Sequence, residues 1–418
     1  MVSINELREK FPQIPLSIII KTDLHVEGIK YSAIMAEVGR WALPTNLWFA
    51  DWSYDVKERN KTATDAWLSV PETIILEDGT TSVISFTSNS PYEVRIIDGK
   101  TVLYRDDEPL ENVSFQPKPK WFSKRTSTGT AMTDVAGMVG DCFIVTMSSF
   151  CEYWKLGQPC KFCSMSSAAE SRIDLGMHGT QIRKRITDVT ETFRAALEER
   201  AATGLDLNHY VLTGGAFVDR KKEAQDYIQT VQAMTDVIDE YEFDVRSRIS
   251  SQAFENDDAE KLHDVGLYES EWNLEVWDEQ LFPVICPGKA KHVGREKWIK
   301  SMIDAVKVFG EGRVVTNLIV GCEQMPPHGF KSQDEGLKSN LSGAEELIQQ
   351  GISPRMNHLI RGKGSVYEGL KSVSTEYLLE TGYSVHELMK RYGLPPQETV
   401  CNKCDIFSCG FDYPRLLG

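Results

Sequence analysis

The stretch CFIVTMSSFCEYWKLGQPCKFCSM, residues 142–165, joins a mainly apolar run to three closely spaced cysteines. An apolar run of this length is typical of a strand that is buried on both faces of a parallel sheet. Cys151, Cys160 and Cys163 follow directly where this strand would end. Parallel αβ folds carry their chemistry at the carboxyl ends of the strands. The sequence therefore predicts that the three thiols lie at a reactive edge of the fold.

Strands and helices alternate regularly after this stretch. Further strands are expected over residues 208–215, 243–250, 270–277, 313–321 and 352–360. Helices are expected over residues 182–203, 221–240, 258–266, 293–309 and 340–351. Strands separated by helices of this length pair in parallel through right-handed crossovers. We therefore expect an α/β fold in which residues 140–362 form a partial (βα)6, TIM-like barrel.

Two further regions flank the expected barrel. Residues 1–135 contain short β-rich runs at 81–86, 92–97 and 101–105, separated by turn sequences such as EDGT and IDGK. This pattern predicts a β-rich N-terminal region. Residues 363–418 are expected to form a helical C-terminal extension that carries its own group of cysteines.

The composition limits the classes of function. The chain has 418 residues, of which 41% are hydrophobic and 26% charged, and its formal net charge is −15. No apolar run is long enough to span a membrane, and the N-terminus has no secretion signal. The acidic balance makes binding to nucleic acid unfavourable, because phosphates are bound by clustered Lys and Arg. We expect a cytoplasmic protein with no membrane partner.

The nine cysteines are better explained by metal binding than by disulfides, because thiols of a protein that is not exported are kept reduced. Three cysteines on one loop can hold three irons of a [4Fe–4S] cluster and leave the fourth iron open. The alternative, a structural zinc site, requires four ligands. Neither a Cys nor a His closely follows Cys163 to complete such a set.

Cys160-Lys-Phe-Cys163 resembles the second half of the signature of the radical S-adenosylmethionine (SAM) superfamily. The resemblance implies that Cys151, Cys160 and Cys163 hold a [4Fe–4S] cluster whose open iron chelates the amino and carboxyl groups of SAM. It also implies that Phe162 packs near the adenine. The first gap departs from the usual pattern, with eight residues between Cys151 and Cys160 in place of three. This puts the subfamily in doubt more than the superfamily.

The same resemblance suggests residues that contact SAM at later strand ends. Gly214 and Gly215, in LTGGAF, resemble the stretch whose backbone meets the SAM amino group, with Ala216 in place of the usual acid. Arg246 and Arg248, in the third strand, are candidates for pairing with the SAM carboxylate.

Two further strands extend this set. Glu275 corresponds to a polar group near the ribose, and a buried carboxylate there needs a partner. Ile319, Gly321 and Glu323 resemble a pattern that contacts adenine. The segment Pro287-Gly288-Lys289 resembles a stretch that shapes a loop over the site.

Cys401, Cys404 and Cys409 form a second group within nine residues. They are expected to hold an auxiliary iron–sulfur cluster or a single zinc or iron ion with a fourth ligand from elsewhere in the chain. A group without metal is the remaining alternative. Cys286 and Cys322 are candidates for the missing ligand or for a thiol facing the substrate, the alternative being that they are buried and inert.

The resemblance implies an enzyme that reductively cleaves SAM at the [4Fe–4S] cluster to a 5′-deoxyadenosyl radical, which takes hydrogen from an unidentified substrate. The substrate would be a small molecule or a protein or peptide, and the electron donor a flavodoxin or ferredoxin. No cobalamin-binding motif is visible. The alternative is an iron–sulfur or zinc protein that acts as a scaffold or regulator and does not cleave SAM.

Overall fold

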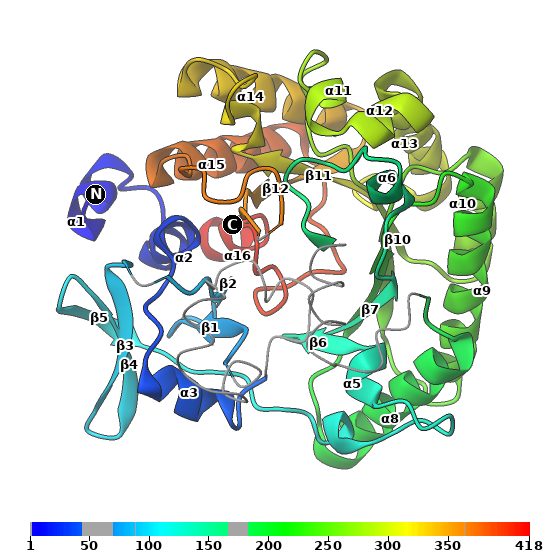
Figure 1. Ribbon diagram of the computed structural model, residues 1–418, viewed down its shortest axis with the longest axis horizontal. Helices are drawn as coiled ribbons and strands as arrows, with labels where there is room; N and C mark the ends of the chain where they lie inside the picture. Colours follow the sequence, from blue (N-terminus) through cyan, green and yellow to red (C-terminus); the bar gives the residue numbers. More distant parts are fainter. Residues whose placement is uncertain (1, 44–69, 88, 166–182, 363) are drawn as a thin grey trace.

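The computed structural model describes residues 2–43, 70–87, 89–165, 183–362 and 364–418. A curled sheet of seven strands forms a half-barrel in the order β12-β11-β10-β9-β8-β7-β6 (Figure 1). Its strands are β6 Gly137–Val139, β7 Cys142–Ser148, β8 His209–Gly214, β9 Arg246–Ser251, β10 Glu269–Trp272, β11 Val314–Val320 and β12 Ile352–His358. Strands β7 to β12 are parallel, so all six strands expected from the sequence are present in the expected order.

Strand β6 was not expected, and it makes the sheet mixed. It pairs antiparallel with β7, with Val139 opposite Cys142. Only Gly140 and Asp141 connect the two strands, and Gly140 has a positive φ of 56°. Two-residue hairpins need such a conformation, which glycine adopts without steric cost. Strand β6 is therefore the edge strand of the sheet, next to β7.

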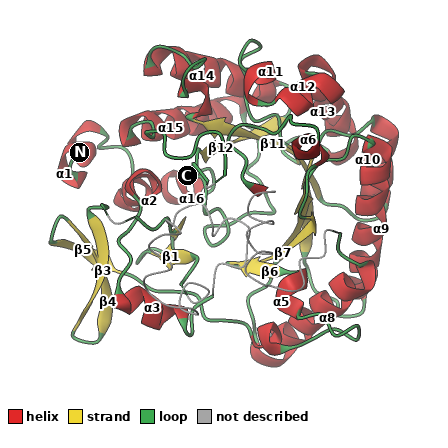
Figure 2. Ribbon diagram, viewed as in Figure 1, coloured by secondary structure: helices red, strands yellow, loops and turns green. Residues whose placement is uncertain are grey.

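Helices cover the outer face of the half-barrel (Figure 2). They are α8 Ile186–Thr203, α9 Arg220–Asp239, α10 Asn256–Asp264, α13 Arg295–Phe309 and α14 Gln333–Gln349. Asp219 caps α9 by accepting a hydrogen bond from the Lys222 N–H, and Ser332 forms a capping box with Glu335 at α14. Their apolar faces and the outer faces of the strands share one large core.

The N-terminal region contains the expected strands and also helices that were not expected. Strands β1 Thr73–Ile75 and β2 Thr81–Val83 form one ribbon, and β3 Tyr92–Ile97, β4 Lys100–Arg105 and β5 Glu108–Asn112 form a second sheet. Before them lie α1 Ile4–Lys10, α2 Leu16–Glu27 and α3 Ala33–Gly39. Helix α2 is buried from Ser17 to His25. A helix buried on all sides has no amphipathic period, so its apolar run does not indicate a helix.

The C-terminal extension is helical, as expected, with α15 Thr375–Tyr392 and α16 Asp412–Leu417. It does not stand alone. Leu379 and Tyr413 belong to the same apolar core as α1 and α2, and Figure 1 shows α2 beside α15 and α16. The two ends of the chain thus form one body against the open side of the half-barrel. No helix in the described part of the chain is both long and apolar enough to cross a bilayer.

Candidate functional site

The three-cysteine loop leaves the carboxyl end of β7, as the sequence predicted. Cys151 is the residue before helix α6, Glu152–Lys155, and the Cys163 N–H donates to the Cys160 carbonyl over 3.0 Å. The long first gap is therefore accounted for by one helical turn. Within that turn Tyr153 is 1% exposed, and its hydroxyl donates to Gln252 Oε1 over 3.0 Å. The inserted residues anchor the loop to the barrel.

The two glycines after β8 bring this loop close to the sheet. A Cβ atom on Gly215 would lie 2.3 Å from the Phe150 carbonyl oxygen and 2.5 Å from the Cys151 N and Cα. The Glu152 N–H donates to the Ala216 carbonyl over 2.9 Å, across the same contact. The close approach of the Cys151 backbone thus requires a glycine at position 215, which also lines the cavity described below.

A second segment holds the loop from the other side. Pro287, Gly288 and Lys289 lie in helix α12, Pro287–His292, which follows the short helix α11, Phe282–Ile285. A Cβ on Gly288 would lie 2.5 Å from the Tyr153 ring. The Lys161 N–H donates to the Ile285 carbonyl over 2.9 Å. The sequence predicted a loop over the site here, and the structure has a helix packed on the cysteine loop.

One cavity of about 280 Å³ lies inside the half-barrel, and all three cysteines line it. The other expected site residues that line it are Phe162, Gly214, Gly215, Arg248, Glu275 and Ile319. These residues come from the cysteine loop and from β8, β9, β11 and the chain after β10. The grouping at the carboxyl ends of parallel strands is the one that the sequence predicted.

The wall of the cavity also carries polar residues that the sequence reasoning missed. Arg248 Nη1 lies 3.4 Å from Glu271 Oε2, which is also 3.8 Å from Arg355 Nη1. Ser250 Oγ and Asn317 Nδ2 donate to Glu271 Oε1 over 2.6 and 3.0 Å. The sequence does contain a signal for them, because polar residues recur at every second position along strands that are otherwise apolar. Alternate positions face the same side of a sheet.

Several polar atoms in this wall have bonding capacity left over. In the described residues, Arg248 Nε and Nη1, Arg355 Nε, and the side-chain oxygens of Asn317 and Asn357 are buried without a hydrogen-bond partner. Buried polar groups are almost always paired in native proteins. Both hydrogen-bond donors and acceptors are therefore available to a polar ligand such as SAM, and the donor set of three thiols suits an iron–sulfur cluster.

The thiols of Cys151, Cys160 and Cys163 all have raised pKa values. Burial raises the pKa of Cys151 to about 11 and that of Cys163 to about 12. The pKa of Cys160 is well above its ordinary value, first because of a hydrogen bond with Cys286 and then because of burial. Metal binding to such thiols releases protons. Cys286 thus lies beside Cys160, fully buried, which places it with the first cysteine group.

Glu275 has the partner that a buried carboxylate needs. Lys289 Nζ lies 2.8 Å from Glu275 Oε1 and 4.7 Å from the centre of the Trp298 ring. Glu275 has a positive φ of 75°, and its backbone still joins β11 through hydrogen bonds with Asn317 and Ile319. From this position Glu275 lines the cavity.

Two expected contacts are not made. Arg246 is the first residue of β9, so it lies at the opposite end of the barrel from the carboxyl edge. There its Nη1 donates a hydrogen bond to Glu398 Oε2 over 2.9 Å. Gly321 and Glu323 also lie outside the lining of the cavity that the described residues form. The Gly321 N–H donates to Glu323 Oε2 over 2.8 Å, and Glu323 accepts from Tyr377 and Asn340, so this pair joins β11 to α14 and α15.

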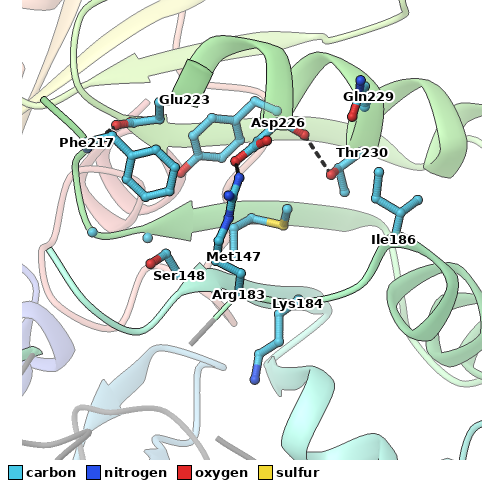
Figure 3. Close-up of a pocket in the computed structure, with 13 residues that line it drawn as sticks. Met147, Ser148, Arg183, Lys184, Ile186, Phe217, Glu223, Asp226, Gln229 and Thr230 are labelled. Atoms are coloured by element: carbon cyan, nitrogen blue, oxygen red, sulfur yellow. Dashed lines mark hydrogen bonds and ion pairs between the residues drawn. The ribbon is translucent and has the colours of Figure 1, made fainter. Parts of the chain in front are cut away.

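A smaller cavity of about 150 Å³ lies between β7, β8 and α9, and Gly214 and Gly215 form part of its lining (Figure 3). Arg183 points across it to Asp226, with which it forms an ion pair. Glu223 accepts hydrogen bonds from the Phe217 N–H and from Gln252 Nε2, each over 2.6 Å. Burial raises the pKa of Glu223 to about 7. Through Gln252, this carboxyl supports the hydroxyl of Tyr153 in the cysteine loop.

The C-terminal cysteines do not meet as one group of three. Cys401 and Cys404 lie together, with their sulfurs 3.8 Å apart. Cys409 is buried against α2, with Sγ 3.5 Å from Thr22 Oγ1. Cys322, the other single cysteine considered, is fully buried at the end of β11.

No family model matches the chain. It is 25% identical over 314 residues to a bacteriochlorophyllide c C-7(1)-hydroxylase from Chlorobaculum limnaeum, covering 72% of this chain and 73% of that protein. A methylornithine synthase (PylB) structure has a TM-score of 0.42 at 15% identity, covering 65% of this chain and 72% of that one. A radical SAM methyltransferase structure from Sphaerobacter thermophilus has a TM-score of 0.39 at 14% identity, covering 96% of each chain.

Proposed function

We propose that the chain is a radical SAM enzyme, and that the 280 Å³ cavity is where SAM is cleaved and hydrogen is taken from the substrate. The cysteine motif and the half-barrel fold support this proposal. One observation carries the proposal. Cys151, Cys160 and Cys163 line the same cavity as Arg248, whose Nε has no hydrogen-bond partner among the described residues, and as Asn317 and Asn357, whose side-chain oxygens have none. A cluster and a polar cofactor would thus be adjacent.

In this proposal the three thiols hold a [4Fe–4S] cluster and leave one iron open. When bound and reduced, the cluster supplies the electron that cleaves SAM to methionine and a 5′-deoxyadenosyl radical. The chain's own contribution is to position the reactants and exclude water. The helical turn at Tyr153 and the packing of Gly215 and Gly288 fix the thiols, and the apolar residues of the cavity limit access of water.

Different side chains of the cavity wall would bind the methionine and adenosine ends of SAM. The guanidinium of Arg248 can pair with the methionine carboxylate, because its Nε and Nη1 have no hydrogen-bond partner among the described side chains. Gly214 and Gly215 present backbone to the methionine end. Phe162 and Ile319 offer apolar surface to the adenine, and Glu275, held by Lys289, can accept hydrogen bonds from the ribose hydroxyls.

The substrate would occupy the side of the cavity that faces the C-terminal extension. Arg355, Asn357 and His358 line that side from β12, and Ile406 and Phe407 line it from the extension. This mixture of polar and apolar groups suits a small molecule, or one side chain of a peptide, that has both characters. The relative named as a hydroxylase makes hydroxylation one candidate reaction. We further propose a cytoplasmic location and a flavodoxin or ferredoxin as electron donor.

The proposal is tested by anaerobic reconstitution with iron and sulfide, followed by an assay for 5′-deoxyadenosine in the presence of SAM and dithionite. The wild type should form 5′-deoxyadenosine and methionine, and Cys160→Ala should form neither. Cys142→Ala, which changes a buried cysteine at the start of β7, is the matched control and should keep the activity. A reconstituted wild type that does not cleave SAM would leave the scaffold or regulatory role as the function.

A further inference from the structure

Four side chains of types that can bind a metal lie together at the amino-terminal edge of the half-barrel. Asp141 precedes β7 and His209 begins β8, while Cys401 and Cys404 come from the C-terminal extension. One ligand atom from each of the four lies within 4.8 Å of the other three. Cys401 Sγ lies 2.9 Å from Asp141 Oδ1, and His209 Nε2 lies 3.5 Å from Asp141 Oδ2.

We propose that Asp141, His209, Cys401 and Cys404 bind a single zinc ion. In a tetrahedral site, Zn–S bonds of about 2.3 Å place two sulfurs about 3.8 Å apart. The sulfurs of Cys401 and Cys404 are 3.8 Å apart, which matches that edge. In a [4Fe–4S] cluster each thiolate binds a different iron, so the ligands surround a cube. Four ligand atoms this close together fit one ion.

The backbone around Cys401 and Cys404 is arranged for thiolates. The Cys401 N–H lies 3.2 Å from Cys404 Sγ, and the Lys403 N–H lies 3.4 Å from Cys401 Sγ. Donors of this kind stabilise the negative sulfurs of a metal site. Gly140 permits the turn to reach the sheet, because a Cβ there would lie 2.4 Å from the Lys403 carbonyl oxygen.

The two ligands from the barrel are also held in place. Asn208 Nδ2 donates to Asp141 Oδ2 over 3.0 Å, which orients the carboxylate. His209 is 8% exposed, and its Nε2 lies 3.5 Å from Asp141 Oδ2, so burial and this contact position the ring. An imidazole nitrogen and a carboxylate oxygen are common zinc ligands beside cysteine. With four protein ligands the site is closed, which is typical of a structural zinc.

The position of the site gives it a structural task. Its ligands join the amino edge of the barrel to the C-terminal extension. The intervening residues reach further, since Asn402 Nδ2 donates to the Gly79 carbonyl over 2.7 Å and the Thr81 N–H donates to the Asn402 carbonyl over 3.2 Å. The zinc would therefore link the barrel to the C-terminal extension and, through Asn402, to the N-terminal region. This structural role does not depend on whether the cavity cleaves SAM.

The first test is metal analysis of the full chain with Cys151→Ala, Cys160→Ala and Cys163→Ala combined, which removes the radical SAM cluster. This protein should contain about one zinc per chain and little iron. Adding Cys401→Ser and Cys404→Ser should remove the zinc. Cys409→Ser, which changes a cysteine outside the ligand group, should leave it in place. Equal zinc with and without Cys401 and Cys404 would overturn the proposal.

The second test needs no variant and so does not depend on whether one folds. Zinc K-edge absorption of the wild type should give two sulfur ligands at about 2.3 Å and two nitrogen or oxygen ligands at about 2.0 Å. A wild type without zinc would overturn the proposal, as would a shell of three or four sulfurs. A loss of about four irons on changing Cys401 and Cys404 would instead assign these residues to an iron–sulfur cluster.

Discussion

Gly215 lies where the chain leaving β8 meets the backbone of Cys151, the first of the three proposed cluster ligands. Its proposed role from the sequence was to let backbone approach SAM. The structure shows a second reason for a glycine here, because a Cβ would lie 2.5 Å from the Cys151 Cα. Backbone atoms cannot move aside as a flexible side chain can. The fit of the cysteine loop to the sheet therefore depends on this residue.

We predict that Gly215→Ala lowers the iron bound after reconstitution, because the added methyl group displaces Cys151. The measurement is iron per chain with the absorbance of the cluster. Gly410→Ala is the matched control, since the nearest atom to a Cβ there is 3.5 Å away and its φ lies outside the positive range that favours glycine. Full cluster content in Gly215→Ala with weakened SAM binding would mean that the glycine serves SAM alone.

Glu223 gives a pH-dependent contribution to stability. Its pKa rises from 4.5 to about 7 because the carboxyl is buried. A raised pKa in the folded state means that the stabilisation is complete below pH 4.5 and is lost as the pH rises through 7. Glu223→Gln removes this titration, so its free energy of unfolding relative to wild type should increase from pH 5 to pH 8.

Urea unfolding at several pH values measures this difference. The control is Glu240→Gln, on the surface, where hydrogen bonds from Arg194 lower the pKa of the carboxyl. A lowered pKa has its effect below pH 4.5, so this variant should show no such trend from pH 5 to pH 8. A flat difference for Glu223→Gln over the same range would show that the Glu223 carboxyl is already ionised at pH 5.

Some site residues could be predicted from the sequence and others could not, for reasons that are local. The cysteines and Arg248 follow from motif and strand order. Arg246 looked equivalent because it shares a strand face with Arg248, but position along the strand decides which end of the barrel it reaches. His209 and Asp141 lie far in sequence from Cys401, and no spacing links them. They come together only because the C-terminal extension packs against the amino-terminal edge of the barrel.

At the scale of elements, contacts between β12 and the loop before α16 hold one boundary of the cavity in place. Arg355 Nη2 donates to Asp405 Oδ1 over 2.5 Å, and both side chains are buried. Asp405 also accepts from Ser408 Oγ over 2.7 Å and from the Phe411 N–H over 3.0 Å. One carboxylate thus fixes the loop to the sheet. Arg355 holds the pKa of that carboxyl below its ordinary value, against the effect of burial.

We predict that Asp405→Asn destabilises the protein by about 3–5 kcal/mol, the usual cost of removing one partner of a buried ion pair. Urea unfolding at pH 7 measures the loss. Asp304→Asn is the control, because its partner Lys300 is 74% exposed and such surface pairs contribute about 0–1 kcal/mol. A loss no larger than that of the control would mean that the loop is held by its other contacts.

The strands and helices of the half-barrel were predictable because their hydrophobic patterns differ, and because the two patterns alternate along the chain. Helix α2 was not, since Ile18, Ile19 and Ile20 are all buried and give no 3.6-residue period. Strand β6 was missed for another reason. It has only three residues, Gly137 to Val139, and its pairing depends on a two-residue turn.

At the scale of the whole molecule, the N-terminal and C-terminal regions act as one body that faces the open side of the half-barrel. The sequence suggested separate flanking units, because they are far apart along the chain. Their common core joins α1 and α2 to α15 and α16. The cavity is thus bounded by the barrel on one side and by residues 404–407 on the other. In the proposed function, these two boundaries would help to keep a reactive intermediate from water.

The most direct test is electron paramagnetic resonance of the reduced, reconstituted protein with and without SAM. The three-cysteine site predicts a [4Fe–4S] signal whose g-values change when SAM binds the open iron. Cys160→Ala should lose both the signal of this cluster and its response to SAM. A wild-type spectrum that SAM leaves unchanged, or a Cys160→Ala spectrum that responds as the wild type does, would contradict the assignment of this cavity.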